Sequence, residues 1–221
     1  MSEEMKLYFG DTHLHTAYSF DAFLNDNDSA YRDTAYRWAR GLPVIHPYTR
    51  TRVQIETPLD FLVVSDHAEY LGVITELARD RDQLIDLGFF KNLVRDIQIW
   101  FALFMIDIGR AEDVFNYALP EPASGDGHDL VADPNGSIAP VPYGDVTNIK
   151  TKVWQDIVKS AEEHYIPGIF TSFVGWEWTS TPTGANLHRV IISPDGAEKA
   201  LKYLPYGSDV SQYPRDLWKW L

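Results

Sequence analysis

Two acidic residues and two histidines lie close together in the stretch YFGDTHLHTAYSFDA, residues 8–22. In an extended chain, side chains two residues apart point to the same side, so His13 and His15 can bind one ion or a pair of ions. Imidazole nitrogens suit zinc, manganese and iron. Asp11 and Asp21 can add carboxylate ligands, or Asp11 can orient a histidine ring. The alternative is a polar strand end with hydrogen-bonded histidines.

Further candidate ligands lie in three later segments of the chain. Asp66 and His67 follow directly after an apolar run at residues 61–64. Glu177 lies between two tryptophans, and a buried glutamate without a partner is costly, so it is usually paired or bound to a metal. His188 lies near the start of another β-rich run, where a hydrogen-bonded core histidine is the common alternative. Taken together, these groups favour a metal site.

The candidate residues lie at the ends of segments that are predicted to be β-strands. The predicted strands are residues 5–13, 58–67, 168–178 and 186–193. Helical patterns lie between them at residues 27–40, 71–118 and 149–166, and a last helix starts at Pro214. This alternation favours a parallel α/β architecture, in which active sites lie at the carboxyl ends of the strands. Four separate segments are therefore expected to build one pocket.

The region between the second and third predicted strands is unusually long. Its helical part, residues 71–118, is expected to break at Gly88 and Gly109. Residues 119–148 are rich in Pro, Gly, Asp and Asn and are predicted to form a long surface loop. The most apolar window, residues 97–109, is too short to span a bilayer, so we expect no membrane association. It is interpreted as a buried helix, a lid or a dimer surface.

The composition limits the classes of function. The 221 residues suffice for one domain with a substantial core, and the hydrophobic fraction of 45% is ordinary for a globular protein. The net charge of −13 disfavours an extended nucleic acid as a partner. The chain has no cysteine, which excludes disulfides, thiolate zinc sites and a cysteine nucleophile. The lack of cysteine and of an N-terminal secretory signal fits a cytoplasmic location.

Four motifs resemble those of the PHP (polymerase and histidinol phosphatase) superfamily and occur in the same order. DTHLHTAYSFDA resembles its first motif, FLVVSDHAEY the second, FVGWEWTS the third and ANLHRVIIS the next. More narrowly, YFGDTHLHTAYSFDA, DFLVVSDHAEYLG and FTSFVGWEWTS together resemble the DUF3604 family, PHP-like proteins of unassigned function. The later superfamily motifs do not follow in this sequence. The chain is therefore expected to be an N-terminal fragment that the missing C-terminal part of the same protein completes.

The resemblance implies an α/β fold of a definite kind, a distorted (β/α)7 TIM-like barrel that is incomplete in this chain. It would form a single domain over residues 1–221, with a helical and loop insertion at about 71–148. It also implies two or three divalent metal ions, which would be manganese, zinc or iron. The implied metal ligands are His13, His15, Asp21, His67, Glu177 and His188. Asp11 and Asp66 would orient these ligands or bind an ion occasionally.

The activity that the resemblance implies is metal-dependent hydrolysis of a small anionic ester, most simply a phosphate ester, with an activated water as nucleophile. Arg189 is a candidate contact for the anion, and Arg50 and Arg52 are weaker ones. The alternative for each arginine is a solvated surface charge. Sulfate or phosphonate esters suit the same site, and nuclease activity is a further alternative that the net charge disfavours.

A non-catalytic alternative also stays open. The domain could bind metal structurally or act as an interaction module, with the apolar segment 97–109 as a partner or homo-oligomer surface. Three further histidines lie outside the motifs. His46 and His128 could line the mouth of the pocket, whereas His164 is expected to interact with the end of its own helix.

Overall fold

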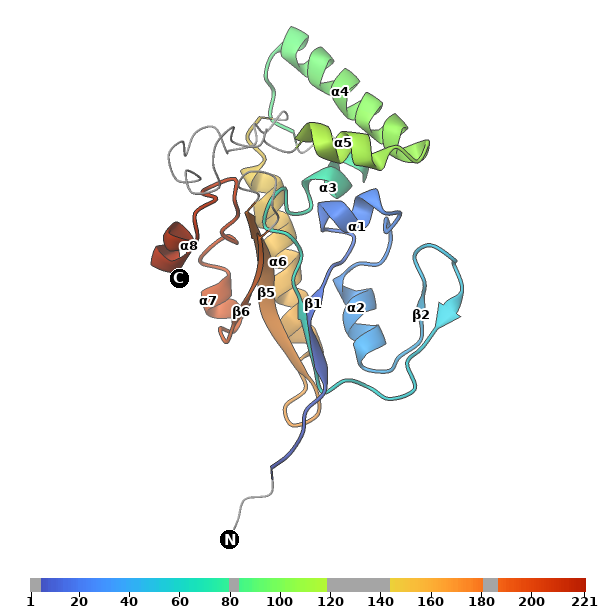
Figure 1. Ribbon diagram of the computed structural model, residues 1–221, viewed down its shortest axis with the longest axis vertical. Coiled ribbons are helices and arrows are strands. Elements are labelled where there is room, and N and C mark those ends of the chain that lie inside the picture. The colour runs from blue at the N-terminus through green and yellow to red at the C-terminus, as the bar shows by residue number, and fades with distance from the viewer. Residues whose placement is uncertain (1–4, 80–83, 119–143, 181–186) are drawn as a thin grey trace.

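The protein has a mixed α/β fold built on one four-stranded sheet (Figure 1). A computed structural model of the chain describes residues 5–79, 84–118, 144–180 and 187–221. The strands of this sheet are β1 (Gly10–Leu14), β4 (Phe61–Val64), β5 (Thr171–Ser180) and β6 (Leu187–Ser193), in the order β1-β4-β5-β6. All four strands overlap segments that the sequence predicts to be strands.

The sheet is only partly parallel, so the predicted parallel architecture is wrong for its last strand. β1, β4 and β5 run parallel, but β6 runs antiparallel to β5. Only residues 181–186 separate β5 from β6. A parallel return needs a crossover of a dozen or more residues, and this connection is too short for one. The start of β6 therefore lies beside the end of β5, at the carboxyl ends of the parallel strands.

One face of the sheet packs against helices and the other face is concave. The helices α6 (Thr147–His164) and α2 (Arg32–Ala39) cover the packed face (Figure 1). Side chains of these helices form one buried cluster with strand residues such as Leu62, Val64 and Trp176. The sheet curls so strongly that the outer strands β1 and β6 approach each other on the concave side. The result is a half-barrel of four strands.

The helix α6 shows how its sequence pattern produces this packing. Its buried apolar residues recur every three or four positions, which places them on the one face that meets the sheet: Ile149, Val153, Trp154, Ile157, Val158 and Ala161. The helix predicted at residues 149–166 thus exists, with a start two residues earlier. It ends at His164, shortly before Pro167, because the residue that precedes a proline disfavours the helical conformation.

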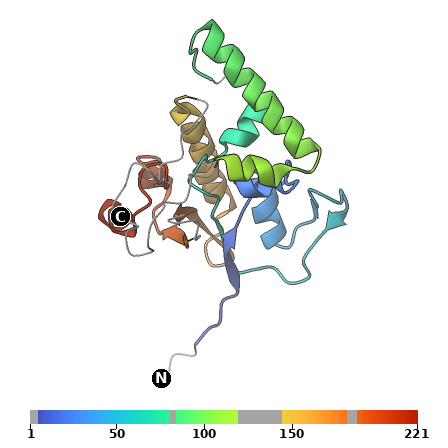
Figure 2. The ribbon, with the colours of Figure 1, turned by 45° about the horizontal axis from the view of Figure 1, so that its top comes forward.

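A helical subdomain follows β4 and lies beyond the carboxyl ends of the strands (Figures 1 and 2). It consists of α3 (Val73–Arg79), α4 (Phe89–Asp107) and α5 (Ala111–Ala118). The breaks predicted at Gly88 and Gly109 are confirmed, because these residues adopt positive φ angles of 88° and 75° on either side of α4. Large apolar side chains of α4 are exposed along its outer face.

Several short elements escaped the sequence analysis because they are too short to show a periodic pattern. They are α1 (Phe20–Leu24), α7 (Ala197–Ala200) and the antiparallel pair of β2 (Val44–Ile45) and β3 (Arg52–Val53). The helix predicted at residues 27–40 begins only at Arg32. The last helix, α8 (Pro214–Trp220), starts at the predicted proline.

Two remaining predictions concern the long loop and the membrane. Residues 119–143 of the loop predicted at 119–148 lie outside the described residues, and its last two residues belong to α6. Within the described ranges, no helix combines the length and the apolar character that crossing a membrane requires.

Candidate metal centre

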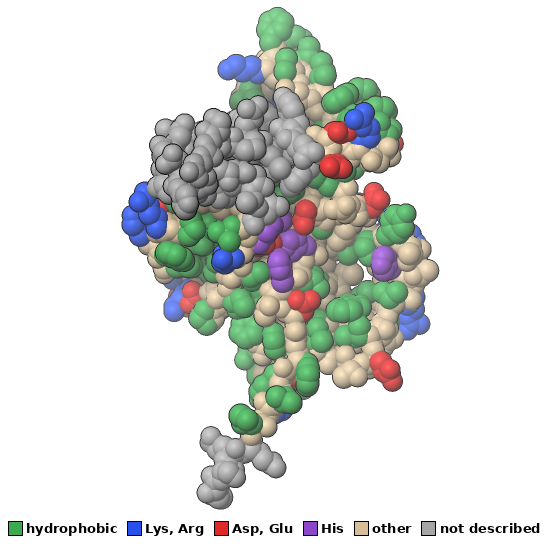
Figure 3. Space-filling model, in the orientation of Figure 1, with side chains coloured by type: hydrophobic (Ala, Val, Ile, Leu, Met, Phe, Trp, Pro, Cys, Tyr) green, Lys and Arg blue, Asp and Glu red, His purple; other side chains and the backbone are tan. Residues whose placement is uncertain are grey.

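The six residues predicted to be metal ligands lie together at one end of the concave face. Figure 3 shows histidine side chains gathered near the middle of the molecular surface that it draws. The six residues are His13, His15, Asp21, His67, Glu177 and His188. β1, β4 and β5 bring their residues from their carboxyl ends, and the antiparallel β6 brings one from its start. The sequence reached the correct grouping even though it missed the direction of β6.

Glu177 is the centre of this cluster. Its side chain is fully buried at the end of β5. Its Oε2 lies 2.9 Å from His13 Nε2, 2.8 Å from His15 Nε2 and 3.7 Å from His67 Nδ1. Its Oε1 lies 2.6 Å from His188 Nδ1. One carboxylate therefore meets four imidazole rings, which come from β1, from the residue just after β1, from the turn after β4 and from β6.

Asp21 supplies a second carboxylate from the first turn of α1. Its two oxygens lie 3.1 Å from His15 Nδ1, and Oδ2 lies 3.7 Å from His67 Nε2. His15 and His67 thus lie between two carboxylates, with one ring nitrogen facing Asp21 and the other facing Glu177. Phe20 stacks on His67 with a centroid distance of 4.7 Å, and this contact shields the ring on one side.

These six residues form three overlapping groups, each with ligand atoms within 4.8 Å of one another. The groups are His13–His15–Glu177, His15–Asp21–His67 and His67–Glu177–His188. His15, His67 and Glu177 each belong to two groups, and the other three residues to one. A carboxylate that is shared between adjacent groups, as Glu177 is, can bridge neighbouring cations.

The charges of the cluster are strongly coupled. Burial would lower the pKa of His15, but its hydrogen bonds with Asp21 and the nearby carboxylate of Glu177 raise this pKa to about 10. Burial likewise opposes the effect of Asp21 and Glu69 on His67, yet these carboxylates raise its pKa to about 9. Burial would raise the pKa of Glu177, but the contact with His15 and the charge of His67 lower it to about 2. The pKa of Asp21 is lowered well below its usual range by the same two histidines, against the effect of burial.

These shifts mean that protons on His15 and His67 balance the charge of the carboxylates in the metal-free protein. A divalent cation could replace these protons, because the imidazoles must be neutral and the carboxylates ionised to act as ligands. Metal binding at this cluster would therefore release protons.

The hydrogen-bond geometry also fits metal ions. His15 Nε2 and Glu177 Oε1 are buried and have no hydrogen-bond partner. His15 Nε2 nevertheless lies 2.8 Å from Glu177 Oε2, and Glu177 Oε1 lies 2.6 Å from His188 Nδ1, without a hydrogen bond in either contact. Buried polar atoms in native proteins almost always have partners. Cations bound among these nitrogen and oxygen atoms would supply them, and the mixed histidine and carboxylate donors suit zinc, manganese or iron.

The two other predicted acids lie beside the cluster and hold its backbone. Asp66 is buried and accepts two hydrogen bonds from Thr16, from the backbone N–H at 2.5 Å and from the hydroxyl at 2.8 Å. Burial raises the pKa of this carboxyl. Asp11 accepts the backbone N–H of His13 at 2.9 Å. Both acids thus fix the chain on either side of the histidine pair, and their hydrogen bonds go to groups other than the imidazole rings.

Arg189 lies on the other face of β6 from His188. In the register of the β5–β6 pair, His188 faces Thr179 and Arg189 faces Trp178, whose side chain packs on the outer side of the sheet. The exposed Arg189 donates a hydrogen bond to the carbonyl of His188 at 2.7 Å. Successive side chains of a strand point to opposite faces. This placement does not support the predicted contact between Arg189 and a substrate anion.

The weaker sequence candidates lie away from the cluster. His46 accepts the backbone N–H groups of Tyr48 and Thr49 in an exposed turn. His164 pairs with Asp33 at 3.1 Å and stacks on Tyr36.

The two remaining arginines are surface groups, and His128 lies outside the described residues. Arg50 forms an exposed ion pair with Asp28 at 3.2 Å. Arg52 is exposed on β3. Neither guanidinium reaches the cluster.

Two polar residues beside the cluster were missed by the sequence analysis. Thr179 places its hydroxyl 2.9 Å from His67 Nδ1 and 3.2 Å from His188 Nδ1. Glu69 brings a buried carboxylate to 3.6 Å from His67 Nδ1. The alternation of β5 could have identified Thr179, because it lies two residues after Glu177 and on the same face. Glu69 lies in a turn, where no periodic pattern indicates which way a side chain points.

Comparison with known proteins gives one result. The family described as Protein of unknown function (DUF3604) matches residues 2–221. No curated protein and no solved structure matches the chain. Because this match covers more than half of the sequence, the chain belongs to the DUF3604 family.

Proposed function

We propose that this protein is a metal-dependent hydrolase of the PHP superfamily that acts on small phosphate esters. The observation that carries the proposal is the fully buried Glu177, whose two oxygens meet His13, His15, His67 and His188 within 3.7 Å. A buried carboxylate surrounded by four imidazoles is an expensive arrangement to maintain for stability alone. Two or three divalent cations held by the six ligand residues would account for it.

The proposed fold extends what the chain displays. The curled half-barrel, with its ligands at the carboxyl ends of the parallel strands, is what part of a (β/α)7 barrel of PHP type would provide. In barrels of parallel strands the active site lies at this end. The barrel closure is a proposal, which an experimental structure of a member of this family would test.

The cluster has a closed side and an open side. The side chains of His67 and Glu177 are 3% and 0% exposed, whereas those of His13 and His188 are 50% and 38% exposed. A substrate would approach from the side of His13 and His188. His67 and Glu177 would hold the ions from the buried side, where water is excluded and electrostatic interactions are stronger than in water.

The chemistry follows from this placement. Bound divalent cations lower the pKa of water and stabilise charge on phosphoryl oxygens, so no protein nucleophile is needed. The residues of this chain would hold the ions and exclude water from the buried side, and the partners of the imidazole N–H groups would fix the tautomer that offers a free nitrogen to an ion. Sulfate and phosphonate esters carry the same charge pattern and are the nearest alternative substrates. The net charge of −13 disfavours a long nucleic acid.

A second candidate function rests on α4. The outer face of this helix exposes large apolar residues, among them Phe90, Ile97 and Trp100, with exposures of 78%, 55% and 60%. Such a face is typical of an interaction surface. A metal-binding module without hydrolytic activity would use both the cluster and this helix.

The experiment that separates these functions compares metal content and hydrolysis in the same preparations. Wild-type protein and the variants Glu177→Gln and His67→Ala would be assayed with an aryl phosphate after loading with manganese or zinc. We expect hydrolysis in the wild type and its loss in both variants. The control His46→Ala alters an exposed histidine outside the cluster and should keep wild-type activity. Metal binding without any hydrolysis of phosphate, sulfate or phosphonate esters would favour the non-catalytic module.

A further inference from the structure

Glu69 is a buried acidic residue next to the candidate metal centre, and only 7% of its surface is exposed. It lies in the tight turn that follows His67. This turn contains two residues in the left-handed conformation, Tyr70 with φ 53° and Gly72 with φ 66°. A Cβ added to Gly72 would lie 2.5 Å from Val153 Cγ2, so the turn is pressed against α6. The turn directs Glu69 back towards the end of β5.

One carboxylate oxygen of Glu69 is used by the backbone of two other segments. Its Oε1 accepts the N–H of Thr179 at 3.1 Å and the N–H of Ser208 at 2.6 Å. Thr179 lies near the end of β5, and Ser208 lies between α7 and α8. These two bonds explain why the carboxylate is held in one place. An amide oxygen could accept both of them equally well.

The other carboxylate oxygen faces His67. Glu69 Oε2 is buried, has no hydrogen-bond partner and lies 3.6 Å from His67 Nδ1. The hydroxyl of Thr179 lies nearer to the same nitrogen, at 2.9 Å. His67 Nε2 lies on the opposite side of the ring, 3.7 Å from Asp21 Oδ2. An imidazole that binds a cation through Nε2, together with His15 and Asp21, would therefore point its Nδ1–H at Thr179 and Glu69.

We propose that Glu69 is a positioning residue which, with the hydroxyl of Thr179, holds His67 ready to bind a cation through Nε2. The inference rests on the proposed metal centre and adds a residue to it. A metal-bound histidine donates its other N–H to a carboxylate, carbonyl or hydroxyl, and this bond fixes both the tautomer and the orientation of the ring. At 3.6 Å the carboxylate of Glu69 lies beyond hydrogen-bond distance, so it acts on this N–H through its negative charge.

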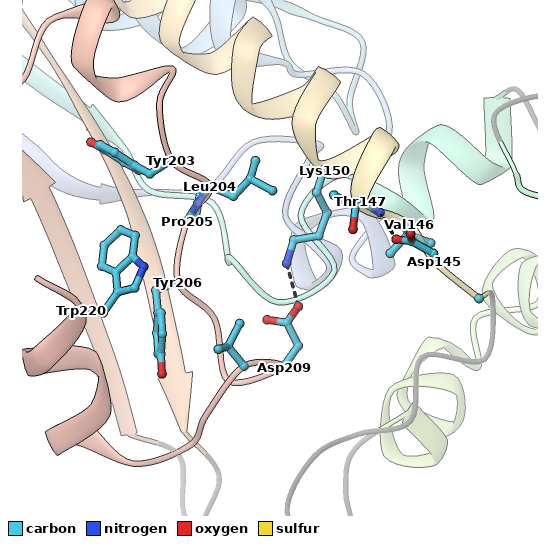
Figure 4. A pocket seen from close by; sticks show the side chains of 12 residues that line it. Asp145, Val146, Thr147, Lys150, Tyr203, Leu204, Pro205, Tyr206, Asp209 and Trp220 are labelled. Atoms are coloured by element: carbon cyan, nitrogen blue, oxygen red, sulfur yellow. Dashed lines mark hydrogen bonds and ion pairs between the residues drawn. The ribbon is translucent and has the colours of Figure 1, made fainter.

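The position of the segment 206–211 can be used to test whether the structure around Glu69 is unchanged in a variant. It contacts Glu69 through Ser208 and lines a cavity of about 620 Å³, where Asp209 pairs with Lys150 at 2.7 Å (Figure 4). Two tryptophans of β5 donate their indole N–H groups to backbone carbonyls of this segment, at 3.2 Å and 3.1 Å. Tryptophan fluorescence therefore reports whether the segment keeps its place when Glu69 is changed.

The test uses Glu69→Gln in the full chain. The amide oxygen of the glutamine can accept the same hydrogen bonds from the backbone N–H groups of Thr179 and Ser208. The amide nitrogen then takes the place of the carboxylate oxygen that faces His67. Chelator-treated protein would be titrated with Co²⁺, followed by its visible absorption and by calorimetry. We expect the affinity for one ion to fall about 10- to 100-fold, and the cobalt spectrum to change, with unchanged tryptophan fluorescence. The matched control is Glu76→Gln. Glu76 is a buried glutamate of α3 that pairs with Lys152 of α6 at 3.0 Å, and this variant should bind Co²⁺ like the wild type.

A second pair of variants covers the case in which Glu69→Gln disturbs the fold. Thr179→Val removes the hydroxyl beside His67 and keeps the backbone N–H that Glu69 accepts. It should weaken Co²⁺ binding, and Thr179→Ser should restore it.

The outcomes separate the two proposals. Wild-type affinity and an unchanged cobalt spectrum in both Glu69→Gln and Thr179→Val would overturn the role of Glu69 and leave the metal centre standing. A wild-type protein that binds no Co²⁺ would overturn the metal centre, and the role of Glu69 with it.

Discussion

His188 lies directly opposite Thr179 in the antiparallel pair of β5 and β6, and its Nδ1 lies 2.6 Å from Glu177 Oε1. This contact exists because β6 turns back on β5. A residue at the start of an antiparallel strand meets residues at the end of its neighbour. The last strand thus completes a cluster that the parallel strands alone would leave open on one side.

Removing the central carboxylate should abolish metal binding and destabilise the metal-free protein. In Glu177→Gln, four imidazoles lose the negative charge that they share, and the protons of His15 and His67 lose an ionic partner. Breaking a buried ion pair costs about 3–5 kcal/mol, so we expect a loss of this order in the free energy of unfolding at pH 6. Urea denaturation in the presence of a chelator measures it. A stability equal to that of the wild type would show that Glu177 is not coupled to the histidines.

The stability of the metal-free protein should depend on pH in a way that the pKa shifts define. The raised pKa values of His15 and His67, about 10 and 9, stabilise the fold fully below their usual value of 6.5 and lose this effect as pH rises through 9 to 10. The lowered pKa of Glu177, about 2, stabilises the fold above 4.5, and this effect is lost as pH falls towards 2. Urea midpoints of chelator-treated protein should therefore be highest between about pH 4.5 and 6.5.

Bound metal ions should offset the loss of stability that the metal-free protein shows as the pH rises. Because binding displaces protons from the histidines, metal affinity should rise with pH from 6 to 8. Calorimetric titration with Zn²⁺ or Mn²⁺ in buffers of different ionisation enthalpy would count the released protons. Binding without proton release would contradict the proposed ligation by these histidines.

Ligand residues that belong to two groups should matter more than those that belong to one. Glu177→Ala removes a carboxylate from two of the three groups, whereas His13→Ala removes a ligand from one. We expect Glu177→Ala to lower the bound metal by at least one equivalent more than His13→Ala, as measured by elemental analysis after gel filtration. Equal losses would argue against shared ligands.

The turn that carries Glu69 gives a prediction about stability. Gly72→Ala introduces a Cβ in the left-handed region and 2.5 Å from Val153 Cγ2. Gly168 has a similar φ of 76° but nothing within 4 Å of an added Cβ. The backbone strain should cost about 1–2 kcal/mol in both variants, and the contact with Val153 about 1–3 kcal/mol more in Gly72→Ala. Thermal or urea denaturation measures the free energy of unfolding of both variants. An equal loss in the two would show that α6 moves enough to relieve the contact with Val153.

The sequence was most informative where local pattern and burial agree. The apolar run ending at Asp66 and His67, and the glutamate between two tryptophans, both predicted strand ends and polar groups at those ends. The grouping of ligands followed, because the carboxyl ends of adjacent parallel strands meet at one edge of a sheet. His188 was placed correctly for a different reason, since only the direction of β6 brings its start to that edge.

The remaining features depend on tertiary structure that no local pattern records. Glu69 lies in a turn whose direction is set by Tyr70 and Gly72 against α6. Arg189 was expected near the anion because it adjoins His188 in sequence, but adjacent residues of a strand face opposite sides. The elements of two to five residues, such as α1, are too short for a periodic signal, although α1 supplies Asp21 to the cluster.

The central claim, a polynuclear metal centre around Glu177, is tested most directly by elemental analysis combined with calorimetric titration of Mn²⁺ or Zn²⁺ into chelator-treated full-length chain, for the wild type and Glu177→Gln. The account predicts about two or three bound ions per wild-type chain, and a loss of all high-affinity binding in Glu177→Gln. A folded wild-type protein that binds no divalent cation at pH 8, or a Glu177→Gln variant that binds as many ions as the wild type, would contradict it.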